Sequence, residues 1–265
     1  MFFTTDLHIH SDYPAQADRL SVMRECAAAA RENGLETIGF SEHYWNRAFP
    51  GKGRYYEDRG PETLREIREA VRMLQEETPL KILTGCESEY GMDGTIPLTE
   101  EDLSLLDYVV VPHSHLNYIG VTTPHDYTDH WKECAEYMVQ TFRGVTSHPL
   151  ADRITVLAHP FEPVGYGEHQ NEILRWIPDT QFRECVREAQ DKGIALEINS
   201  LTVRGFSPEE LVRSEWVRFY TIAREEGCTF VYGSDLHGTA QFAYKKLAET
   251  VAGEAGITDE MMLQI

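Results

Sequence analysis

Short apolar segments alternate with longer amphipathic stretches along most of the chain. Seven runs rich in β-branched and aromatic residues have the length of buried strands, and the stretches between them show helical periodicity. The runs span residues 2–9, 36–40, 80–86, 108–111, 154–158, 194–198 and 228–232. Strands that are separated by helical crossovers run parallel in one sheet. The pattern predicts an α/β protein, built as either a closed barrel or an open doubly wound sheet.

Two of the amphipathic stretches have clear end signals. In the first, Ser21 is placed to accept hydrogen bonds from first-turn amides, and Gly34 suits the left-handed residue that ends a helix. In the second, Ser207 precedes a proline and is followed three residues later by Glu210, which is the pattern of a capping box. We expect a helix from Ser207 to Gly227, where a glycine again ends it.

Composition and charge narrow the class of protein. The 265 residues contain no linker or low-complexity tract, so a single domain is the simplest organisation. The formal net charge of -20 disfavours binding to nucleic acids and to anionic membranes. No apolar run approaches the roughly 20 residues of a membrane helix, and the first residues do not resemble a signal peptide. We therefore expect a cytoplasmic protein.

The cysteines do not form a disulfide pattern. They are odd in number, far apart, and embedded in apolar helix or strand patterns: Cys26, Cys86, Cys134, Cys185 and Cys228. We expect all five to be reduced residues of the core.

Metal-ligand residue types stand at the C-terminal end of nearly every apolar run. In parallel α/β proteins these ends share one face, and active sites are built there. The residues are His8, His10, Glu42, His43, Glu87, Glu89, His113, His115, His159, Glu197, Asn199, Asp235 and His237. A lone histidine is usually an ordinary polar residue, but the same coincidence at most of the seven run ends predicts a metal centre.

The ligand types indicate the metals and the reaction. Imidazole and carboxylate without thiolate suit Zn, Mn or Fe(II), and the number of candidates exceeds the four ligands of one ion, so we expect two or three divalent ions. A carboxylate can bridge two ions, for which Glu87 and Asp235 are the candidates. Closely spaced ions share a hydroxide that attacks a phosphoryl group or a polarised carbonyl, so hydrolysis is the inferred reaction.

A phosphorylated substrate also needs cations near the same strand ends. Arg204, just after the sixth run, is the best placed. Arg47, Lys52 and Arg54 lie in the long loop after the second run and are candidates to close over the site.

The ordered motifs DLHIH, GFSEH, GCESEY, LAHP, LEINS and GSDLH resemble those of the polymerase and histidinol phosphatase (PHP) family, over about residues 5–240. The closest branch is that of stand-alone histidinol-phosphatase-like proteins. The resemblance implies a distorted (β/α)7 barrel and three metal positions. The first would use His8, His10, Glu87 and Asp235; the second Glu87, His159 and one histidine of HSH; and the third His43, His237 and a residue of the early loop.

Two ligands stay open because the sequence departs from the family pattern. The loop after HxH lacks the usual histidine, so Asp18, or less favourably Asp12, would take its place. At the fourth run both His113 and His115 are available, and the apolar Leu116 that follows favours His115.

The resemblance also implies roles in catalysis. Asp235 or His237 would protonate the leaving oxygen, and Arg204 would bind phosphate. Glu42 stands where aspartate is commoner in the family, and Glu197 and Asn199 either orient ligands or satisfy the strand end.

Three functions remain in view at this point. The first is hydrolysis of a small phosphorylated metabolite, with L-histidinol phosphate as the named candidate. The second is an amidohydrolase-like attack on a C–N or lactone bond. The third is a metal-binding scaffold without activity, or a nuclease module, which the negative charge disfavours. The sequence leaves a homo-oligomer open.

Overall fold

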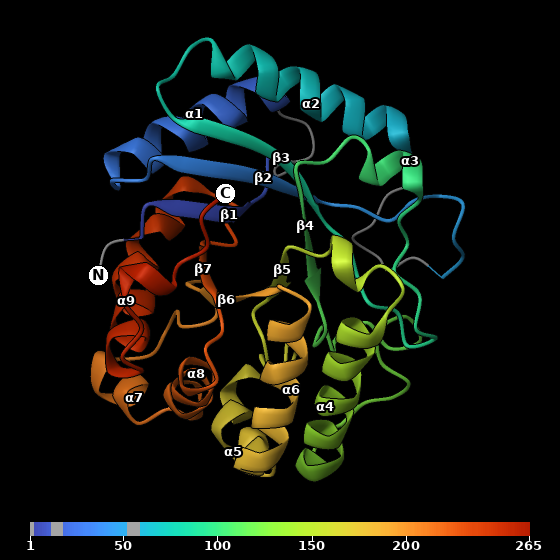
Figure 1. Ribbon diagram of the computed structural model, residues 1–265, viewed down its shortest axis with the longest axis vertical. Coiled ribbons are helices and arrows are strands. Elements are labelled where there is room, and N and C mark those ends of the chain that lie inside the picture. The colour runs from blue at the N-terminus through green and yellow to red at the C-terminus, as the bar shows by residue number, and fades with distance from the viewer. Residues whose placement is uncertain (1–2, 12–17, 52–58) are drawn as a thin grey trace.

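Seven parallel strands close into a barrel in a computed structural model that describes residues 3–11, 18–51 and 59–265 (Figure 1). They are β1 (Thr5–Ile9), β2 (Thr37–His43), β3 (Lys81–Glu87), β4 (Tyr108–Pro112), β5 (Val156–Ala158), β6 (Ala195–Asn199) and β7 (Phe230–Gly233). Their order around the barrel is their order in the sequence. The last strand returns to the first, where Asp6 of β1 is in register with Tyr232 of β7.

This closure decides between the two architectures that the sequence left open. The doubly wound sheet is excluded, and the (β/α)7 barrel implied by the family resemblance is confirmed. Each predicted run overlaps one strand. Several strands are displaced by one to three residues towards the C-terminus, and β2 extends to His43, so that His43 is part of the sheet itself.

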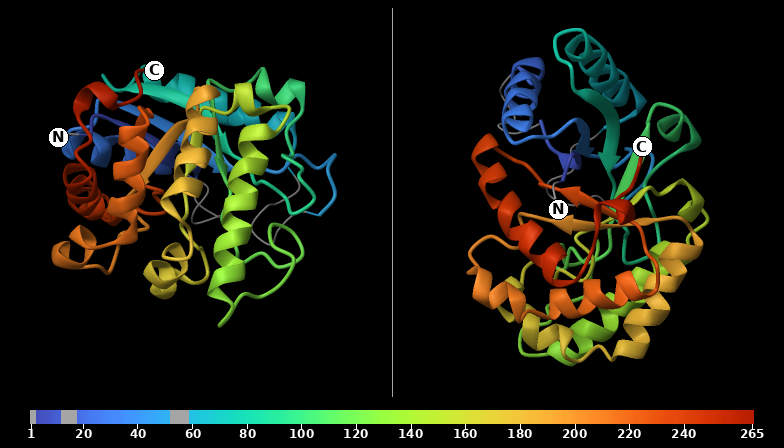
Figure 2. Two further views of the ribbon diagram at one scale, coloured as in Figure 1. Left: turned by 60° about the horizontal axis from the view of Figure 1, so that its bottom comes forward. Right: turned by 60° about the vertical axis from the view of Figure 1, so that its left-hand side comes forward.

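Helices surround the barrel. They are α1 (Arg19–Glu32), α2 (Pro61–Gln75), α3 (Glu100–Leu103), α4 (Trp131–Ser147), α5 (Gln170–Leu174), α6 (Asp179–Asp191), α7 (Pro208–Val212), α8 (Glu215–Glu225) and α9 (Lys245–Glu254). Short 3-10 turns lie at Ala151–Arg153, Gly167–His169, Thr239–Tyr244 and Asp259–Met261. Helices α1 and α2 cover β1–β3 on one side, and α4, α5, α6 and α8 cover the opposite side (Figures 1 and 2). No helix in the described part of the chain is both long and apolar enough to cross a bilayer.

The first predicted helix end needs a correction. The helix begins before Ser21, and Asp18 is its N-cap residue, because the Asp18 carboxylate accepts from the backbone N–H of Ser21 at 3.0 Å and from its hydroxyl at 2.7 Å. Both residue types are good N-caps, and the sequence alone did not separate them. The predicted end is confirmed, since Gly34 has a φ of 77°.

The long helix predicted after Ser207 is in fact two helices, α7 and α8. The capping box between Ser207 and Glu210 is confirmed. Ser214 then takes an extended conformation and its hydroxyl donates to the carbonyl of Leu211, which ends the first helix. The second helix starts with its Glu215 N–H donating to the Asn171 side chain, a partner that only the folded protein supplies.

The apolar core has two layers. Side chains inside the barrel form one cluster: Leu7, Tyr108, Val110, Val156, Ala158, Ala195 and Val231. A larger cluster fills the space between the strands and the helices, and it includes all five cysteines, which are buried and unpaired as predicted. Near the C-terminus, Leu263 packs against the inner cluster, and its N–H donates to the carbonyl of Phe230 at the start of β7. This contact covers the end of the barrel at which the strands begin.

Candidate metal centre

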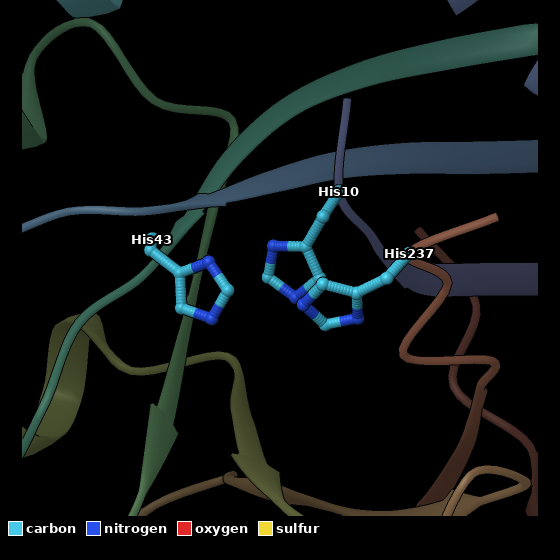
Figure 3. A group of neighbouring side chains, drawn as sticks. All are labelled: His10, His43 and His237. Carbon is cyan, nitrogen blue, oxygen red and sulfur yellow. The ribbon is translucent and has the colours of Figure 1, made fainter. Parts of the chain in front are cut away.

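Three imidazoles converge at the C-terminal end of the barrel (Figure 3). His10 follows β1, His43 ends β2 and His237 follows β7. One nitrogen of each lies within 4.8 Å of those of the other two. The rings of His10 and His43 stack with centroids 4.1 Å apart, and those of His10 and His237 are 4.4 Å apart. Neighbouring strand ends therefore bring together residues that are up to 227 positions apart in the sequence.

Glu87 lies between two further clusters. It groups with His8 and His10 on one side and with His115 and His159 on the other. Its Oε1 is 3.5 Å from His8 Nε2 and 3.6 Å from His159 Nε2. The second oxygen, Oε2, is 3.7 Å from His10 Nε2. Because its two oxygens face different histidines, this carboxylate is placed to serve two ions.

Asp235 approaches the same histidines from β7. Its Oδ1 is 3.5 Å from His10 Nε2, 3.8 Å from His8 Nε2 and 3.5 Å from His237 Nδ1. Asp235 thus adds a second carboxylate to the centre.

The residues fit divalent metal ions. His8 Nε2 and both ring nitrogens of His10 are buried without a hydrogen-bond partner among the described residues, an arrangement that is costly unless something else binds them. Ligand atoms around a tetrahedral ion with bonds of about 2.0–2.2 Å are about 3.3–3.6 Å apart, close to the separations given above. Nitrogen and carboxylate donors without sulfur suit Zn, Mn or Fe(II). The clusters are consistent with a site for more than one ion.

Glu197 of β6 holds two of the ligands. Its Oε1 accepts from His8 Nδ1 at 2.7 Å, and its Oε2 accepts from the backbone N–H of His159 at 2.6 Å and from Asn199 Nδ2 at 3.0 Å. With the proton of His8 on Nδ1, the Nε2 atom presents its lone pair to the centre. The carboxylate has room because residue 233 is glycine: a Cβ on Gly233 would overlap Glu197 Oε1.

Other acidic residues support the ligand-bearing segments. Asp6 Oδ1 accepts from the N–H groups of His8 and Ser234, both at 3.0 Å, and so joins β1 to the segment that carries Asp235. Glu89 Oε1 is 2.6 Å from His115 Nδ1. These three hydrogen bonds restrict the positions of ligands on β1 and in the segments after β4 and β7.

Two ligand residues have left-handed backbones. His159 has a φ of 26° and Asp235 a φ of 52°, which non-glycine residues rarely adopt. Such conformations persist only where the surroundings enforce them. For Asp235 the neighbouring Leu236 provides this, because its N–H donates to the carbonyl of His8 at 3.2 Å and its carbonyl accepts from His10 N–H at 2.9 Å.

Burial and neighbouring charges shift the ionisation of the centre. Burial, together with His43 and His237, lowers the pKa of His10 to about 3, so this ligand is neutral. Burial would also lower the pKa of His159, but Glu87 and further carboxylates outweigh it and raise that pKa to about 9.

The carboxylates of the centre shift in the opposite direction. Burial would raise the pKa of Glu87, yet His8, His159 and His43 hold it well below its ordinary value. The same competition, dominated by His8 and His10, keeps the pKa of Asp235 well below its usual range. Both carboxylates are therefore ionised ligands.

Several residues proposed from the sequence lie elsewhere. His113 is in the core: its Nε2 accepts from the N–H of Phe161 at 2.9 Å, and its ring contacts Phe142, while His115 lies with Glu87 and His159. Asp18 caps α1.

Of the three cations proposed in the loop after β2, the structure describes Arg47, whose partners lie away from the centre. Arg47 forms an ion pair with Glu62, and its Nε donates to the carbonyl of Arg59 at 3.3 Å. Asp12, Lys52 and Arg54 lie outside the described residues.

A cavity of about 440 Å³ adjoins the centre. His115, His159 and Asp235 line it, and so does Arg204, the cation proposed from the sequence. Glu162 and Gln170 line it as well, and sequence analysis missed both. They lie in the loop after β5 and at the start of α5, where no strand end or repeated spacing marked them.

Comparison with known proteins supports the fold. No family model and no curated protein matches the sequence. Among solved structures, a candidate histidinol phosphatase, HisK, from Listeria monocytogenes superposes with a TM-score of 0.59 at 15% identity, over 89% of this chain and 96% of that one.

Looser matches include ochratoxinase from A. niger, with a TM-score of 0.48 at 13% identity over 98% and 71% of the two chains. Another is N-isopropylammelide isopropylaminohydrolase from Burkholderia multivorans, with a TM-score of 0.47 at 13% identity over 94% and 60%. The likeness to the Listeria protein shows a common fold. The chain therefore combines that barrel with clusters of histidine and carboxylate suited to metal ions.

Proposed function

We propose that this protein is a metal-dependent phosphoesterase that hydrolyses a phosphate monoester of a small metabolite. The observation that carries the proposal is the cavity in which the ligands His115, His159 and Asp235 face the same space as Arg204. A phosphoester needs both features, because metal ions and a guanidinium together offset the charge of the phosphoryl group. The similarity in fold to a candidate histidinol phosphatase supports this choice of substrate class.

The residues of the three clusters, two of which share Glu87, would hold the ions. Bound divalent ions supply charge stabilisation to the phosphoryl group and lower the pKa of water, so that a nucleophile is available at neutral pH. The protein's own residues position and charge the ligands. Glu197 fixes the tautomer and orientation of His8, and Glu87 and Asp235 stay ionised.

Substrate binding and proton transfer have their own residues. Arg204 makes no side-chain hydrogen bond or ion pair with any described residue, so its guanidinium is available to the phosphate oxygens. Of the two residues considered as proton donors, Asp235 is ionised, so His237, whose Nδ1 lies 3.5 Å from Asp235 Oδ1, would donate a proton to the leaving oxygen. Protonation of this oxygen lets the alcohol leave neutral.

Phosphate release from a panel of metabolites tests the proposal. The protein is loaded separately with Zn, Mn and Fe(II) and is incubated with L-histidinol phosphate and other phosphorylated metabolites. We expect phosphate release that the His10→Ala variant loses. Hydrolysis of amide or lactone substrates, with no phosphate released from any ester, would instead support the amidohydrolase-like alternative.

A further inference from the structure

The side-chain amide of Asn199, the last residue of β6, has a hydrogen-bond partner at every site that it offers. Its Nδ2 donates to Glu197 Oε2 at 3.0 Å and to Asp235 Oδ2 at 3.4 Å. Its Oδ1 accepts from the backbone N–H of Leu201 at 2.8 Å and from that of Thr202 at 3.0 Å. An asparagine amide has two donors and two acceptor sites, so this buried group binds the metal centre on one side and the next turn of the chain on the other.

The donor side of the amide holds two carboxylates at the centre. In each case Asn199 binds the oxygen that does not serve a histidine ring. Glu197 uses its other oxygen, Oε1, for His8 Nδ1 at 2.7 Å. Asp235 directs its other oxygen, Oδ1, towards His10 Nε2 at 3.5 Å. The amide therefore fixes which oxygen of each carboxylate faces the histidines.

The acceptor side shapes the segment that carries Arg204. Residues 200–205 form consecutive turns after β6. An asparagine oxygen that accepts from the N–H two residues further on forms a turn of its own, and the N–H of Arg204 extends this one by donating to the carbonyl of Leu201 at 3.2 Å. The Arg204 guanidinium has no partner among the described residues, so the backbone of the turn decides where it lies in the cavity.

The chemistry of residue 199 suits both sides at once. Aspartate would support the turn equally well, but it would place a third carboxylate within hydrogen-bonding distance of Glu197 and Asp235. Serine and threonine support such turns more weakly. An amide is the group that donates to the centre and accepts from the turn.

We propose that Asn199 is a positioning residue that couples the metal centre to phosphate binding, because one planar amide holds both the carboxylates of the centre and the turn that presents Arg204. This inference rests on the proposed phosphoesterase function, in which Arg204 binds the phosphate. The effect of Asn199 on phosphate affinity then passes through Arg204, whereas its effect on metal affinity does not.

A double-mutant cycle on phosphate affinity tests the coupling. The wild type, Asn199→Ala, Arg204→Ala and the double variant are saturated with Zn²⁺ and titrated with inorganic phosphate by calorimetry. We expect Asn199→Ala to weaken phosphate binding by about fivefold or more in the wild-type background, but by less than about twofold in the Arg204→Ala background. A merely structural role would weaken phosphate binding by the same factor in both backgrounds and would contradict the proposal.

Metal affinity provides a second readout with the opposite pattern. Competition titration should show Zn²⁺ binding that is about 10-fold weaker in Asn199→Ala, since groups that orient metal ligands have effects of this size. Arg204 belongs to none of the metal-binding clusters, so the same factor is expected in the Arg204→Ala background. A Zn²⁺ affinity within about twofold of the wild type would contradict the role of the donor side.

Asn199→Asp separates the two sides of the amide and keeps the test decisive if Asn199→Ala does not fold. Aspartate retains the shape and the oxygen that supports the turn, and it replaces the donor NH2 group by a second oxygen. In this background Arg204→Ala should weaken phosphate binding by the wild-type factor, within about twofold. Loss of that factor would show that the turn-facing oxygen does not position Arg204, and would overturn the inference.

Asn171→Ala is the matched control. Asn171 Oδ1 also accepts from a backbone N–H, that of Glu215 at 2.8 Å, but Asn171 does not line the cavity beside the centre. This variant loses a similar hydrogen bond, so its Tm should fall, while its affinities for phosphate and Zn²⁺ should stay within about twofold of the wild type.

The outcomes distinguish the inference from the proposed function. A protein that releases phosphate from esters, but in which Asn199→Ala acts equally in both backgrounds, would overturn the inference and leave the phosphoesterase function standing. No binding of inorganic phosphate and no phosphate release from any ester would overturn the proposed function and the inference with it.

Discussion

Replacing Glu197 by glutamine tests whether the polar network beneath the centre controls metal binding. The two side chains have the same shape, but glutamine offers one acceptor and one donor group in place of two acceptors. In the protein, all three partners of the Glu197 carboxylate are donors: His8 Nδ1, the N–H of His159 and the amide of Asn199. One of the two orientations of glutamine places its NH2 group against His159 N–H and the Asn199 amide.

The other orientation acts on the metal ligand directly. Here the NH2 group of glutamine donates to His8 Nδ1, which moves the imidazole proton to Nε2. That atom faces Glu87 Oε1 at 3.5 Å and Asp235 Oδ1 at 3.8 Å, so the proton occupies the position where a metal would bind. Loss of a supporting partner of this kind lowers metal affinity by about 10- to 100-fold. This corresponds to about 1.4–2.8 kcal/mol of binding free energy.

Competition titration provides the assay. Metal-free Glu197→Gln and wild-type protein are titrated with Zn²⁺ in the presence of a chromophoric chelator, and Tm values verify that both are folded. Glu254→Gln, an exposed substitution on α9, is the control and should bind like the wild type. An affinity of Glu197→Gln within about twofold of the wild type, with an unchanged Tm, would refute the reasoning.

Three further predictions concern the centre and the cavity. Gly233→Ala would place a Cβ against Glu197 Oε1 and should lower the free energy of unfolding by about 1–3 kcal/mol, measured by urea denaturation; full stability would contradict the close approach. Arg204→Ala should raise KM for a phosphate ester by about 10-fold, whereas Arg47→Ala, which removes the ion pair to Glu62, should not; equal effects would argue against a phosphate contact by Arg204. The pKa of His159 is raised to about 9 in the metal-free protein, whereas a ligand histidine must be neutral. Metal binding at pH 7 should therefore release protons, and the metal affinity should increase up to about pH 9. Calorimetry in buffers of different ionisation enthalpy would measure the proton release. The same raised pKa means that the contribution of His159 to the stability of the metal-free fold is complete below about pH 6.5 and is lost as the pH rises through about 9.

The strands were predictable because short apolar runs rich in β-branched residues, placed between amphipathic stretches, usually form buried strands. Each run forms a strand, and the residues that follow meet at one end of the barrel because parallel strands point the same way. The choice between barrel and open sheet was different. It depends on whether β1 pairs with β7, and no local pattern in the sequence encodes that contact.

The ambiguous ligands show where spacing stops being informative. Residues two apart share a face only while the strand continues, and β4 ends at Pro112, just before His113. The chain then turns, so His113 packs in the core against Phe161 while His115 joins Glu87. Likewise, an aspartate before a helix fits a cap and a ligand equally well, and Asp18 is a cap.

The residues that were missed depend on tertiary contacts. Glu162 and Gln170 lie in loop and helix segments without periodicity, and only the folded chain brings them beside Arg204. Glu197 was among the residues predicted at the strand ends. Its hydrogen bonds to the His8 ring and to the backbone N–H of His159 depend on the relative positions of three strands, which the sequence does not specify.

The most direct test of the account is the metal content of the protein. Elemental analysis of the purified chain, after reconstitution with Zn, Mn or Fe(II) and removal of excess metal, should find two or more ions per chain in the wild type and fewer in Glu87→Gln, since Glu87 belongs to two of the three clusters. A wild-type protein that retains no ion after reconstitution would contradict the metal centre and the function proposed from it.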